Sequence, residues 1–173
     1  MRLSLIQVTR VQFRTLSYKI DYETLQETAR LYDIMLTELR AKASGQWRIS
    51  CLHQVFATSY TANSTARGGN VLGLERYTEN FIMYQSYLLW SEAKDDDLFI
   101  TQGKMLTDGI HKFATEKGTA VEYLYLNYAD KDQDPLAAYG ADKVAFMKKV
   151  ARKYDPTGVY QSQLPGGFKI SQV

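Results

Sequence analysis

The sequence has 173 residues, the length of one ordinary domain and enough to bury a hydrophobic core. Apolar residues make up 45% and charged residues 23%, which excludes a disordered tail or a fibrous repeat. The 21 Lys and Arg residues nearly balance the 19 Asp and Glu residues, so the formal charge of +2 gives no sign of a nucleic-acid-binding protein.

Few residues are available for disulfides, metal binding or membrane insertion. Cys51 is the only cysteine, which excludes an intrachain disulfide and a cysteine-rich zinc site. The two histidines, His53 and His111, show no metal-ligand spacing, so we expect no metal. No apolar run reaches the ~18 residues of a membrane span, and residues 1–20 lack the apolar core of a secretion signal. We therefore expect a cytoplasmic protein without a membrane span.

The first half of the chain predicts strands on either side of one helix. Residues 1–20 alternate between polar and apolar side chains, which predicts one or two strands. Asp21 is a suitable N-cap for a helix over about 22–43, where apolar residues recur at helical spacing. Residues 47–56 alternate again and predict a strand. Residues 58–70 are rich in Ser, Thr, Asn and Gly and predict a loop.

The second half predicts a central strand, a long helix, a further strand and a last helix. Residues 80–90 are apolar on both faces, which is typical of a central strand that is covered on both sides. Asp95–Asp97 favour a helix start, and Lys117-Gly118 favour its end. Residues 120–128 are rich in β-formers and predict a strand, and a helix is expected over about 141–154.

This order of elements predicts an α+β fold in a single domain over residues 1–173. Strands and helices that alternate irregularly favour an antiparallel β-sheet with helices packed on one face. The sequence shows no internal repeat, linker or low-complexity segment that would divide the chain.

Several motifs in the second half are those of a known family. They are residues 125–130 (YLNYAD), 153–161 (KYDPTGVYQ) and 165–169 (PGGFK), within a signature over 120–170. This series resembles the C-terminal berberine-bridge signature of fungal FAD-linked oxidases. Residues 69–74 (GNVLGL) and 90–96 (WSEAKDD) are similar to the middle region of the same family.

The resemblance implies a fold that corresponds to part of the substrate-binding domain of berberine-bridge-like oxidases. The FAD-binding domain of that family, with its covalent attachment residues, has no counterpart in this sequence. The glycine pairs at 68–69 and 166–167 are too short for a phosphate-binding loop and are typical of turns. We therefore expect no cofactor, and FAD only if a separate flavin-binding partner exists.

The resemblance also implies catalytic roles for two residues. In the family, the Tyr-x-Asn positions face flavin and substrate, which would make Tyr125 an acid or base and Asn127 a hydrogen-bonding residue that orients the substrate. Alternation along a strand over 121–128 would place Tyr123, Tyr125 and Asn127 on one face. The alternative is that these tyrosines simply pack in the core, with each hydroxyl finding a partner.

Four further residues are candidates for substrate binding. Gln85 and Tyr87 form a polar pair on an otherwise apolar strand face, which fits either a hydrogen-bonded core pair or the lining of a cavity. Tyr123 is a candidate because it shares the predicted face of Tyr125. His53 is the fourth candidate, although a lone histidine on a strand is more often scaffolding.

Three functions remain open at this point. The first is a cofactor-free isomerase or cyclase of fungal secondary metabolism, including a pericyclase. It would position a small hydrophobic substrate in an aromatic pocket, with hydrogen bonding or proton transfer by Tyr and Asn. The second is the accessory substrate-domain half of a split FAD-linked oxidoreductase, and the third is an inactive truncated homologue. An uncovered aromatic sheet face would favour association, so we also expect a homodimer.

Overall fold

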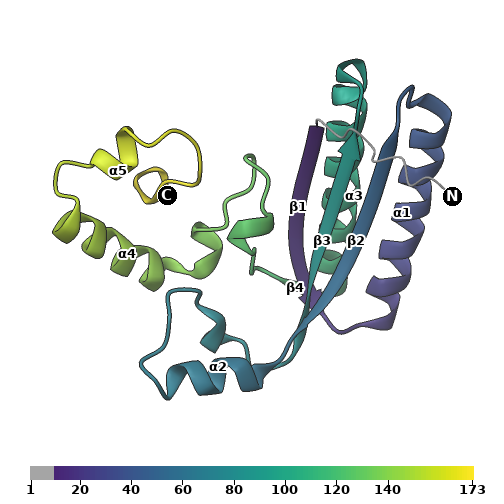
Figure 1. Ribbon diagram of the computed structural model, residues 1–173. Helices are drawn as coiled ribbons and strands as arrows, with labels where there is room; N and C mark the ends of the chain where they lie inside the picture. Colours follow the sequence, from purple (N-terminus) through teal and green to yellow (C-terminus); the bar gives the residue numbers. More distant parts are fainter. Residues whose placement is uncertain (1–9) are drawn as a thin grey trace, which may run out of the picture.

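The computed structural model describes residues 10–173, so the predicted strand region in residues 1–9 lies outside the described residues (Figure 1). In chain order the strands are β1 (Arg10–Lys19), β2 (Trp47–Phe56), β3 (Phe81–Trp90) and β4 (Ala120–Val121). The α-helices are α1 (Tyr22–Lys42), α2 (Thr58–Thr65), α3 (Asp96–Lys117), α4 (Ala141–Tyr154) and α5 (Val159–Ser162). The 3₁₀ turns are η1 (Leu74–Arg76), η2 (Ala93–Asp95), η3 (Leu126–Tyr128), η4 (Ala137–Tyr139) and η5 (Ile170–Gln172).

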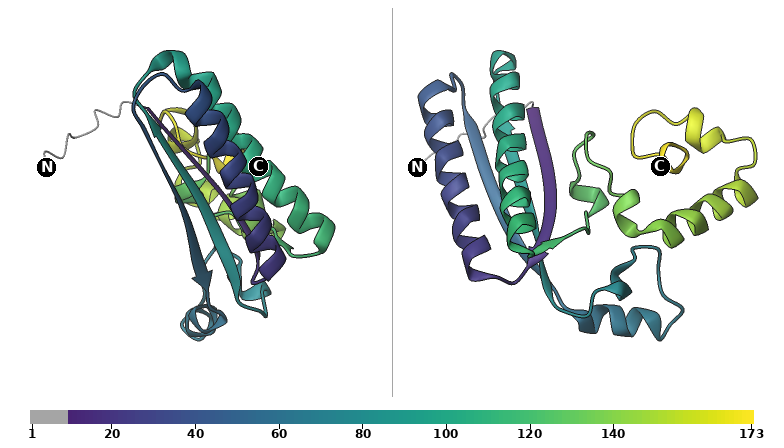
Figure 2. Two further views of the ribbon diagram at one scale, coloured as in Figure 1. Left: turned by 90° about the vertical axis from the view of Figure 1, so that its right-hand side faces the viewer. Right: turned by 180° about the vertical axis from the view of Figure 1, so that it is seen from behind.

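The strands form one antiparallel sheet in the order β2-β3-β1-β4, with α1 and α3 on one face (Figures 1 and 2). The predicted α+β class is therefore confirmed. The register places Phe13 opposite Tyr87 and Thr15 opposite Gln85. Because side chains alternate along a strand, odd-numbered residues of β1 and β3 share a face with even-numbered residues of β2.

Two predictions of local structure are wrong. The strand predicted over 120–128 ends at Val121 and is followed by the 3₁₀ turn η3. The chain leaves the sheet there because the ring of Tyr123 packs between the rings of Phe81 and Tyr139. The predicted loop 58–70 begins with helix α2, whose first amide, that of Thr58, donates to the side chain of Asn80.

The first hydrophobic core lies between the sheet and helices α1 and α3. Leu39 of α1, Leu88 of β3 and Ile110 of α3 are completely buried in it. Trp90 stacks on Phe99 with ring centroids 4.9 Å apart. Burying each large apolar side chain stabilises the fold by about 1.5–3 kcal/mol, so this face supplies much of the stability.

Individual residues determine where α1 begins, where α3 ends and how closely α3 packs against β1. Helix α1 begins where the Asp21 carboxylate accepts a hydrogen bond of 2.8 Å from the amide of Thr24, as the sequence predicts. Helix α3 ends at Lys117 and is capped by Gly118, whose φ of 75° lies in the left-handed region that glycine adopts without strain. A Cβ atom at Gly103 would lie 2.1 Å from Oε1 of Gln12, so a larger residue at this point of α3 would displace the Gln12 side chain.

A buried polar layer links β1, α3 and the loop 129–133. Arg14 is 3% exposed, and its Nε donates to Oγ1 of Thr107 over 2.8 Å. The same guanidinium pairs with Asp132 at 2.6 Å, and Nε2 of Gln12 donates to Asp130 over 2.8 Å. Because an uncompensated buried charge is costly, these contacts fix the loop against β1.

The loop also occupies one point on the outer edge of β1. The side-chain amide of Gln133 accepts a hydrogen bond from the backbone N–H of Thr15 (3.1 Å) and donates one to its carbonyl oxygen (2.7 Å). One side chain thereby takes the place of a residue of a neighbouring strand.

A second hydrophobic core covers one end of the other sheet face. Phe81 and Met83 of β3 pack there with Tyr123, Leu136 and Tyr139 from the segment that follows β4. The Tyr123 ring lies 5.9 Å from those of both Phe81 and Tyr139. The half of this face farther from β4 has no described helix over it (Figure 2). Within residues 10–173, no helix has the length and apolar character needed to cross a bilayer.

Candidate functional site

The candidate functional site is the uncovered half of the sheet face that lies opposite α1 and α3. We call it the open face and define it by Val11, Phe13, Leu52, Tyr87 and Leu89. Val11, near the start of β1, is 52% exposed and Leu52, in the middle of β2, is 42% exposed, although both are large apolar side chains. An exposed apolar patch on a sheet is typical of a surface that binds a ligand or another protein.

An aromatic pair lies at the centre of the open face. The rings of Phe13 and Tyr87 stack with centroids 4.4 Å apart and planes inclined by 26°. Because they come from paired positions on neighbouring strands, the sheet fixes their orientation. Together they form a flat, preorganised apolar wall that is partly exposed.

A polar side chain marks the boundary between the open face and the second core. Gln85 lies two residues from Tyr87 on the same face of β3 and is 5% exposed. Its side-chain amide has no hydrogen-bond partner among the described residues. A nearly buried amide of this kind is available to a polar group of a ligand.

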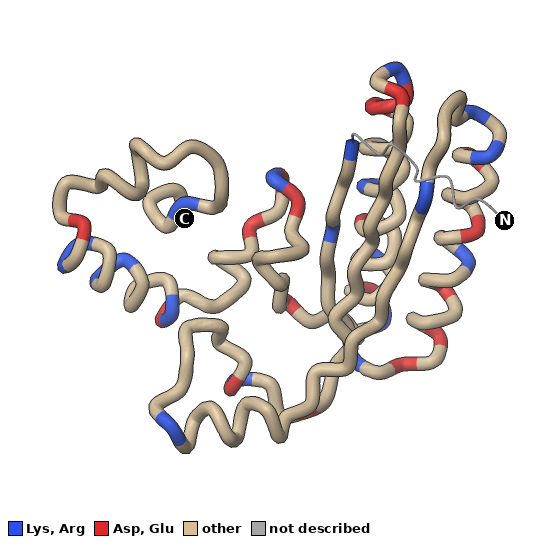
Figure 3. Tube along the Cα trace, viewed as in Figure 1, with Lys and Arg blue, Asp and Glu red and all other residues tan. Residues whose placement is uncertain are grey.

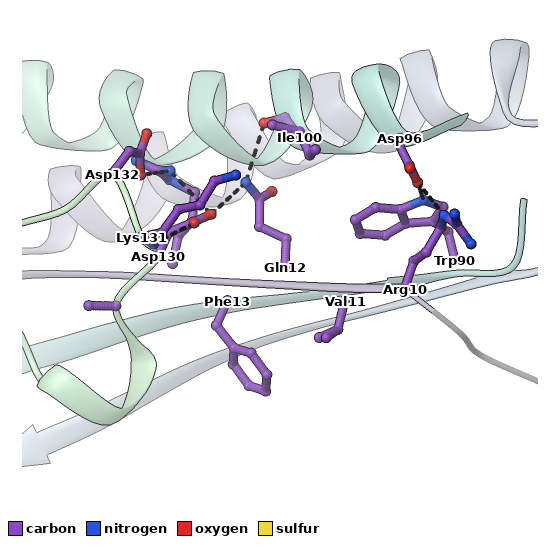
Figure 4. A pocket seen from close by; sticks show the side chains of 12 residues that line it. Arg10, Val11, Gln12, Phe13, Trp90, Asp96, Ile100, Asp130, Lys131 and Asp132 are labelled. Carbon is purple, nitrogen blue, oxygen red and sulfur yellow. Dashed lines mark hydrogen bonds and ion pairs between the residues drawn. The ribbon is translucent and has the colours of Figure 1, made fainter. Parts of the chain in front are cut away.

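The 3₁₀ turn η3 brings two more polar groups beside β1. The hydroxyl of Tyr125 accepts a hydrogen bond of 2.8 Å from the side-chain amide of Asn127. The Tyr125 ring meets that of Tyr128 edge to face, with centroids 4.9 Å apart. In Figure 4 the turn lies on the side of the sheet to which Phe13 and Val11 point. The buried Arg14 holds this arrangement through the loop that follows η3.

A cavity of about 630 Å³ runs along the outer edge of β1 (Figure 4). Its walls are the edge of β1, the start of α3 and the loop 129–132. Val11 and Phe13 belong both to its lining and to the open face. The cavity and the open face are therefore one continuous surface that bends around the strand.

The structure places four of the six residues that the sequence singles out on the open side of the sheet, in two separate pairs. Gln85 and Tyr87 lie on the open side of the sheet, and Tyr125 and Asn127 lie next to it, joined by their hydrogen bond. Tyr125 and Asn127 meet through a 3₁₀ turn, however, and not through the alternation of a strand.

The other two predicted residues lie elsewhere. Tyr123 is completely buried in the second core, where its hydroxyl has no partner among the described residues. Burial raises the pKa of Tyr123 above its usual value, so its phenol stays protonated. His53 lies on the opposite face of the sheet, where its ring meets that of Tyr84 at 5.1 Å. Partial desolvation by its neighbours lowers the pKa of His53 below its usual value.

Sequence reasoning missed Phe13, Val11 and Leu52 as site residues. The alternation of residues 1–20 already places Val11, Phe13 and Thr15 on one face of a predicted strand, so the sequence contained part of the information for Phe13. Only the register shows that Phe13 faces Tyr87, and a single sequence carries no register. Within residues 10–173, no three His, Cys, Asp or Glu side chains come close enough together to hold a metal ion.

Two curated proteins with similar sequences are named FAD-dependent monooxygenases. The chain is 36% identical over 166 residues to the FAD-dependent monooxygenase drtC of Aspergillus calidoustus. The matched region makes up 95% of this chain and 31% of that protein. The chain is 32% identical over 160 residues to the FAD-dependent monooxygenase sdcF of Emericella nidulans, covering 92% and 33%. The chain is similar to one region of fungal FAD-dependent monooxygenases.

A third relative carries a different name. The bifunctional solanapyrone synthase of Alternaria solani is 26% identical over 166 residues, covering 94% of this chain and 31% of that enzyme. The chain spans about a third of the length of these curated relatives. No protein-family model matches the chain, and no solved structure matches it. The berberine-bridge resemblance therefore stays a prediction.

The N-termini of α1, α3 and α5 do not fit the pyrophosphate of FAD. A dinucleotide phosphate is usually held at the N-terminus of a helix that follows a strand. Helix α1 begins with the carboxylates of Asp21 and Glu23, and α3 begins with those of Asp95–Asp97 (Figure 3). In α5 the Asp155 carboxylate accepts hydrogen bonds from the first two amides. These carboxylates would repel a phosphate, so we derive no step through FAD.

Proposed function

We propose that this chain is the substrate-binding part of an FAD-dependent oxidoreductase of fungal secondary metabolism. The open face binds a small, flat, apolar molecule, and the flavin is held by residues other than those described. The observation that carries this proposal is the stacked pair of Phe13 and Tyr87 on an otherwise uncovered sheet face. The similarity to one region of FAD-dependent monooxygenases supports the enzyme class.

The aromatic wall gives the surface its selectivity for shape. A flat ring or a conjugated chain stacks on Phe13 and Tyr87 without any rearrangement of the protein, because the two strands already fix both rings. Val11 and Leu52 extend the apolar area on either side of the pair. A saturated or strongly charged molecule would bind less well to such a wall.

Tyr125 and Asn127 supply the polar contact. Because the Tyr125 oxygen accepts the hydrogen bond from Asn127, its own O–H is free to donate to an oxygen atom of the substrate. The carbonyl of Asn127 is exposed and free to accept a hydrogen bond in return. The proposed roles are proton donation or hydrogen bonding for Tyr125 and orientation for Asn127.

A cofactor-free isomerase or cyclase is the second candidate. The observation that favours it is the acidic start of α1 and α3, which does not suit a dinucleotide. In this reading the aromatic wall holds a flexible, conjugated substrate in a folded shape, and Tyr125 donates one hydrogen bond to it. Titrating the purified chain with FAD does not separate the candidates, since both expect no tight binding by the chain alone. Turnover of a substrate without any flavin would favour the isomerase or cyclase.

The test of the proposed surface is binding of an aromatic probe. We would titrate the protein with 1-anilinonaphthalene-8-sulfonate and follow its fluorescence. Tyr87→Ala removes half of the stacked pair, so we expect the probe to bind about tenfold more weakly. Phe146→Ala is the matched control, since Phe146 is an exposed aromatic residue on α4, outside the open face. Equal affinity in the wild type and Tyr87→Ala would overturn the proposal.

A second pair of variants tests the polar contact. Tyr125→Phe keeps the ring and removes the hydroxyl, whereas Tyr128→Phe does the same to its neighbour in η3. Among flat aromatic compounds that carry one carbonyl group, we expect only Tyr125→Phe to weaken binding, by about three- to tenfold. Unchanged binding in both variants would contradict the role of Tyr125.

A further inference from the structure

The side chain of Gln85 is nearly buried, yet its amide makes no hydrogen bond within the described part of the chain. Gln85 is 5% exposed and lies in the middle of β3, on the face that carries Tyr87. A glutamine amide offers two N–H donors and a carbonyl oxygen that accepts two hydrogen bonds. Buried polar side chains are hydrogen-bonded in most proteins, so an unpaired amide at this depth calls for a physical explanation.

The Gln85 amide is within reach of a ligand. Some buried polar side chains of this protein are both unpaired and sealed from solvent, among them Ser17 and Tyr123. Gln85 is not one of them, so the small part of this residue that stays exposed includes its amide. A molecule that lies on the open face therefore meets the amide.

The neighbours of Gln85 on the sheet do not complete its hydrogen bonds. Thr15 lies opposite on β1, and its hydroxyl already donates to the carbonyl oxygen of Tyr84 over 2.8 Å. Leu52 lies opposite on β2, and Met83 lies two residues away on β3, in the second core. Neither of these two side chains carries an oxygen or nitrogen atom. The donors and acceptors of the Gln85 amide are therefore left for a molecule other than the described residues.

The amide also lies at one end of the aromatic wall. On this face of the sheet, Gln85 and Thr15 form the pair next to Tyr87 and Phe13. Two residues advance a strand by about 6.6–6.8 Å. A flat bicyclic molecule stacked on the wall is long enough to bring its edge to the amide.

We propose that Gln85 determines which flat molecules the open face accepts, by pairing with a donor and an acceptor that lie side by side on the edge of the ligand. The N–H and C=O groups of the side-chain amide lie in one plane and match such an edge with two parallel hydrogen bonds, as glutamine does with adenine. The ligand class is a flat, neutral, conjugated molecule with a lactam edge. An analogue without the N–H leaves the Gln85 carbonyl unpaired and is rejected for that reason. This inference rests on the proposed function, because it requires the open face to be the binding surface.

The first test compares two ligands that differ only in the donor. 2-Quinolinone is a flat bicyclic lactam, and 1-methyl-2-quinolinone carries a methyl group in place of the N–H hydrogen. We would titrate each into the labelled full chain and derive the dissociation constant from backbone amide shifts. The wild type should bind 2-quinolinone about tenfold more tightly than the methylated ligand. Gln85→Leu should bind both alike, whereas a purely steric effect of the methyl group would persist in this variant.

Gln54→Leu is the matched control, because Gln54 lies on the same sheet face, opposite Met83, but is exposed. It should keep the tenfold preference. Gln85→Leu removes an unpaired buried amide, so it should be at least as stable in urea as the wild type. A clear loss of stability would indicate a structural role for Gln85 and overturn the proposal.

The outcomes separate this inference from the proposed function. If the wild type binds both ligands equally well and Tyr87→Ala weakens both, the role of Gln85 is overturned and the open face stands. If the wild type binds neither ligand, both proposals fail.

The second test observes the amide itself. The side-chain NH₂ signals of Gln85 are identified by their absence from the spectrum of Gln85→Leu. We expect them to shift downfield as 2-quinolinone binds, because the amide then donates a hydrogen bond to the lactam carbonyl. Signals that stay in place at saturation would contradict the pairing.

Discussion

The two faces of the sheet are built from the same three long strands but have different surroundings. On one face Leu88 of β3 is completely buried against α1 and α3, together with Phe99 and Ile110 of α3. On the other face the second core covers only one end, and Val11 and Leu52 stay about half exposed. Neighbouring residues of one strand therefore contribute to stability or to binding according to the face on which they lie.

This difference assigns separate tasks to the two faces. The helix face holds the fold together and, through Arg14, fixes the loop that carries η3 against the strand. The open face makes few contacts of its own and is free to bind a ligand. A substitution on one face should therefore affect mainly stability, and one on the other mainly binding.

The largest expected effect comes from adjacent leucines of β3. Leu88 is completely buried on the helix face, whereas Leu89 lies on the open face. Leu88→Ala should lower the free energy of unfolding by about 2–5 kcal/mol because it leaves a cavity in the core. Leu89→Ala should cost about 1 kcal/mol or less. Urea denaturation of both variants measures the contrast, and equal losses would break it.

The next effect comes from two arginines of β1. Arg14→Met should cost about 2–4 kcal/mol, because it removes the partner of Asp132 and the donor to Thr107 in a buried layer. Arg10→Met is the control: the Arg10 side chain is one-third exposed, so the loss should be below about 1 kcal/mol. Amide exchange should also accelerate at 126–133 in Arg14→Met only. Unchanged exchange there would contradict the role of Arg14 in holding the loop.

A smaller effect should appear in acid. Burial acts to raise the pKa of Asp95, but hydrogen bonds from Ser44 and Gly45 outweigh it and lower the pKa below its usual value. The stabilisation by Asp95 is therefore complete above about pH 4 and is lost as the pH falls through the folded-state pKa. Asp95→Asn should be less stable than the wild type at pH 6, with a smaller gap at pH 2. A gap that does not shrink would contradict this account.

The smallest expected effect concerns His53. The His53 side chain is exposed, but partial desolvation by its neighbours lowers its pKa, so the folded protein binds fewer protons than the unfolded chain just below the ordinary value of about 6.5. Stability should fall slightly as the pH drops from 7 to 5, and His53→Gln should reduce this slope. Histidine NMR signals followed over the same range measure the pKa directly. A His53 pKa above 6.5 would be the opposite of the expected result.

Local sequence signals predicted much of the fold. Alternation identified the strand at 47–56, and a run that is apolar on both faces identified the strand at 80–90. Asp21 and Gly118 marked helix ends that the structure confirms. The strand over 120–128 failed because β-formers such as Tyr123 also suit a packed irregular segment. What decided the outcome was the second core, whose partners are far away in sequence.

The candidate site was predictable only in part. Gln85 and Tyr87 were visible as polar residues on an apolar strand face, and Tyr125 and Asn127 through the family motif. Phe13 could not be paired with Tyr87, because the register between β1 and β3 depends on contacts that one sequence does not contain. The tether of Arg14 to Asp132 joins residues over a hundred positions apart and has no local signal.

The most direct test of the central claim is a map of ligand contacts by NMR. Backbone amide shifts would be followed while 1-anilinonaphthalene-8-sulfonate is added to the labelled protein. The account predicts that the largest changes fall on Val11, Phe13, Leu52 and Tyr87 and continue into η3. Changes confined to α1 and α3, or to the C-terminal helices, would contradict the assignment of the open face as the binding surface.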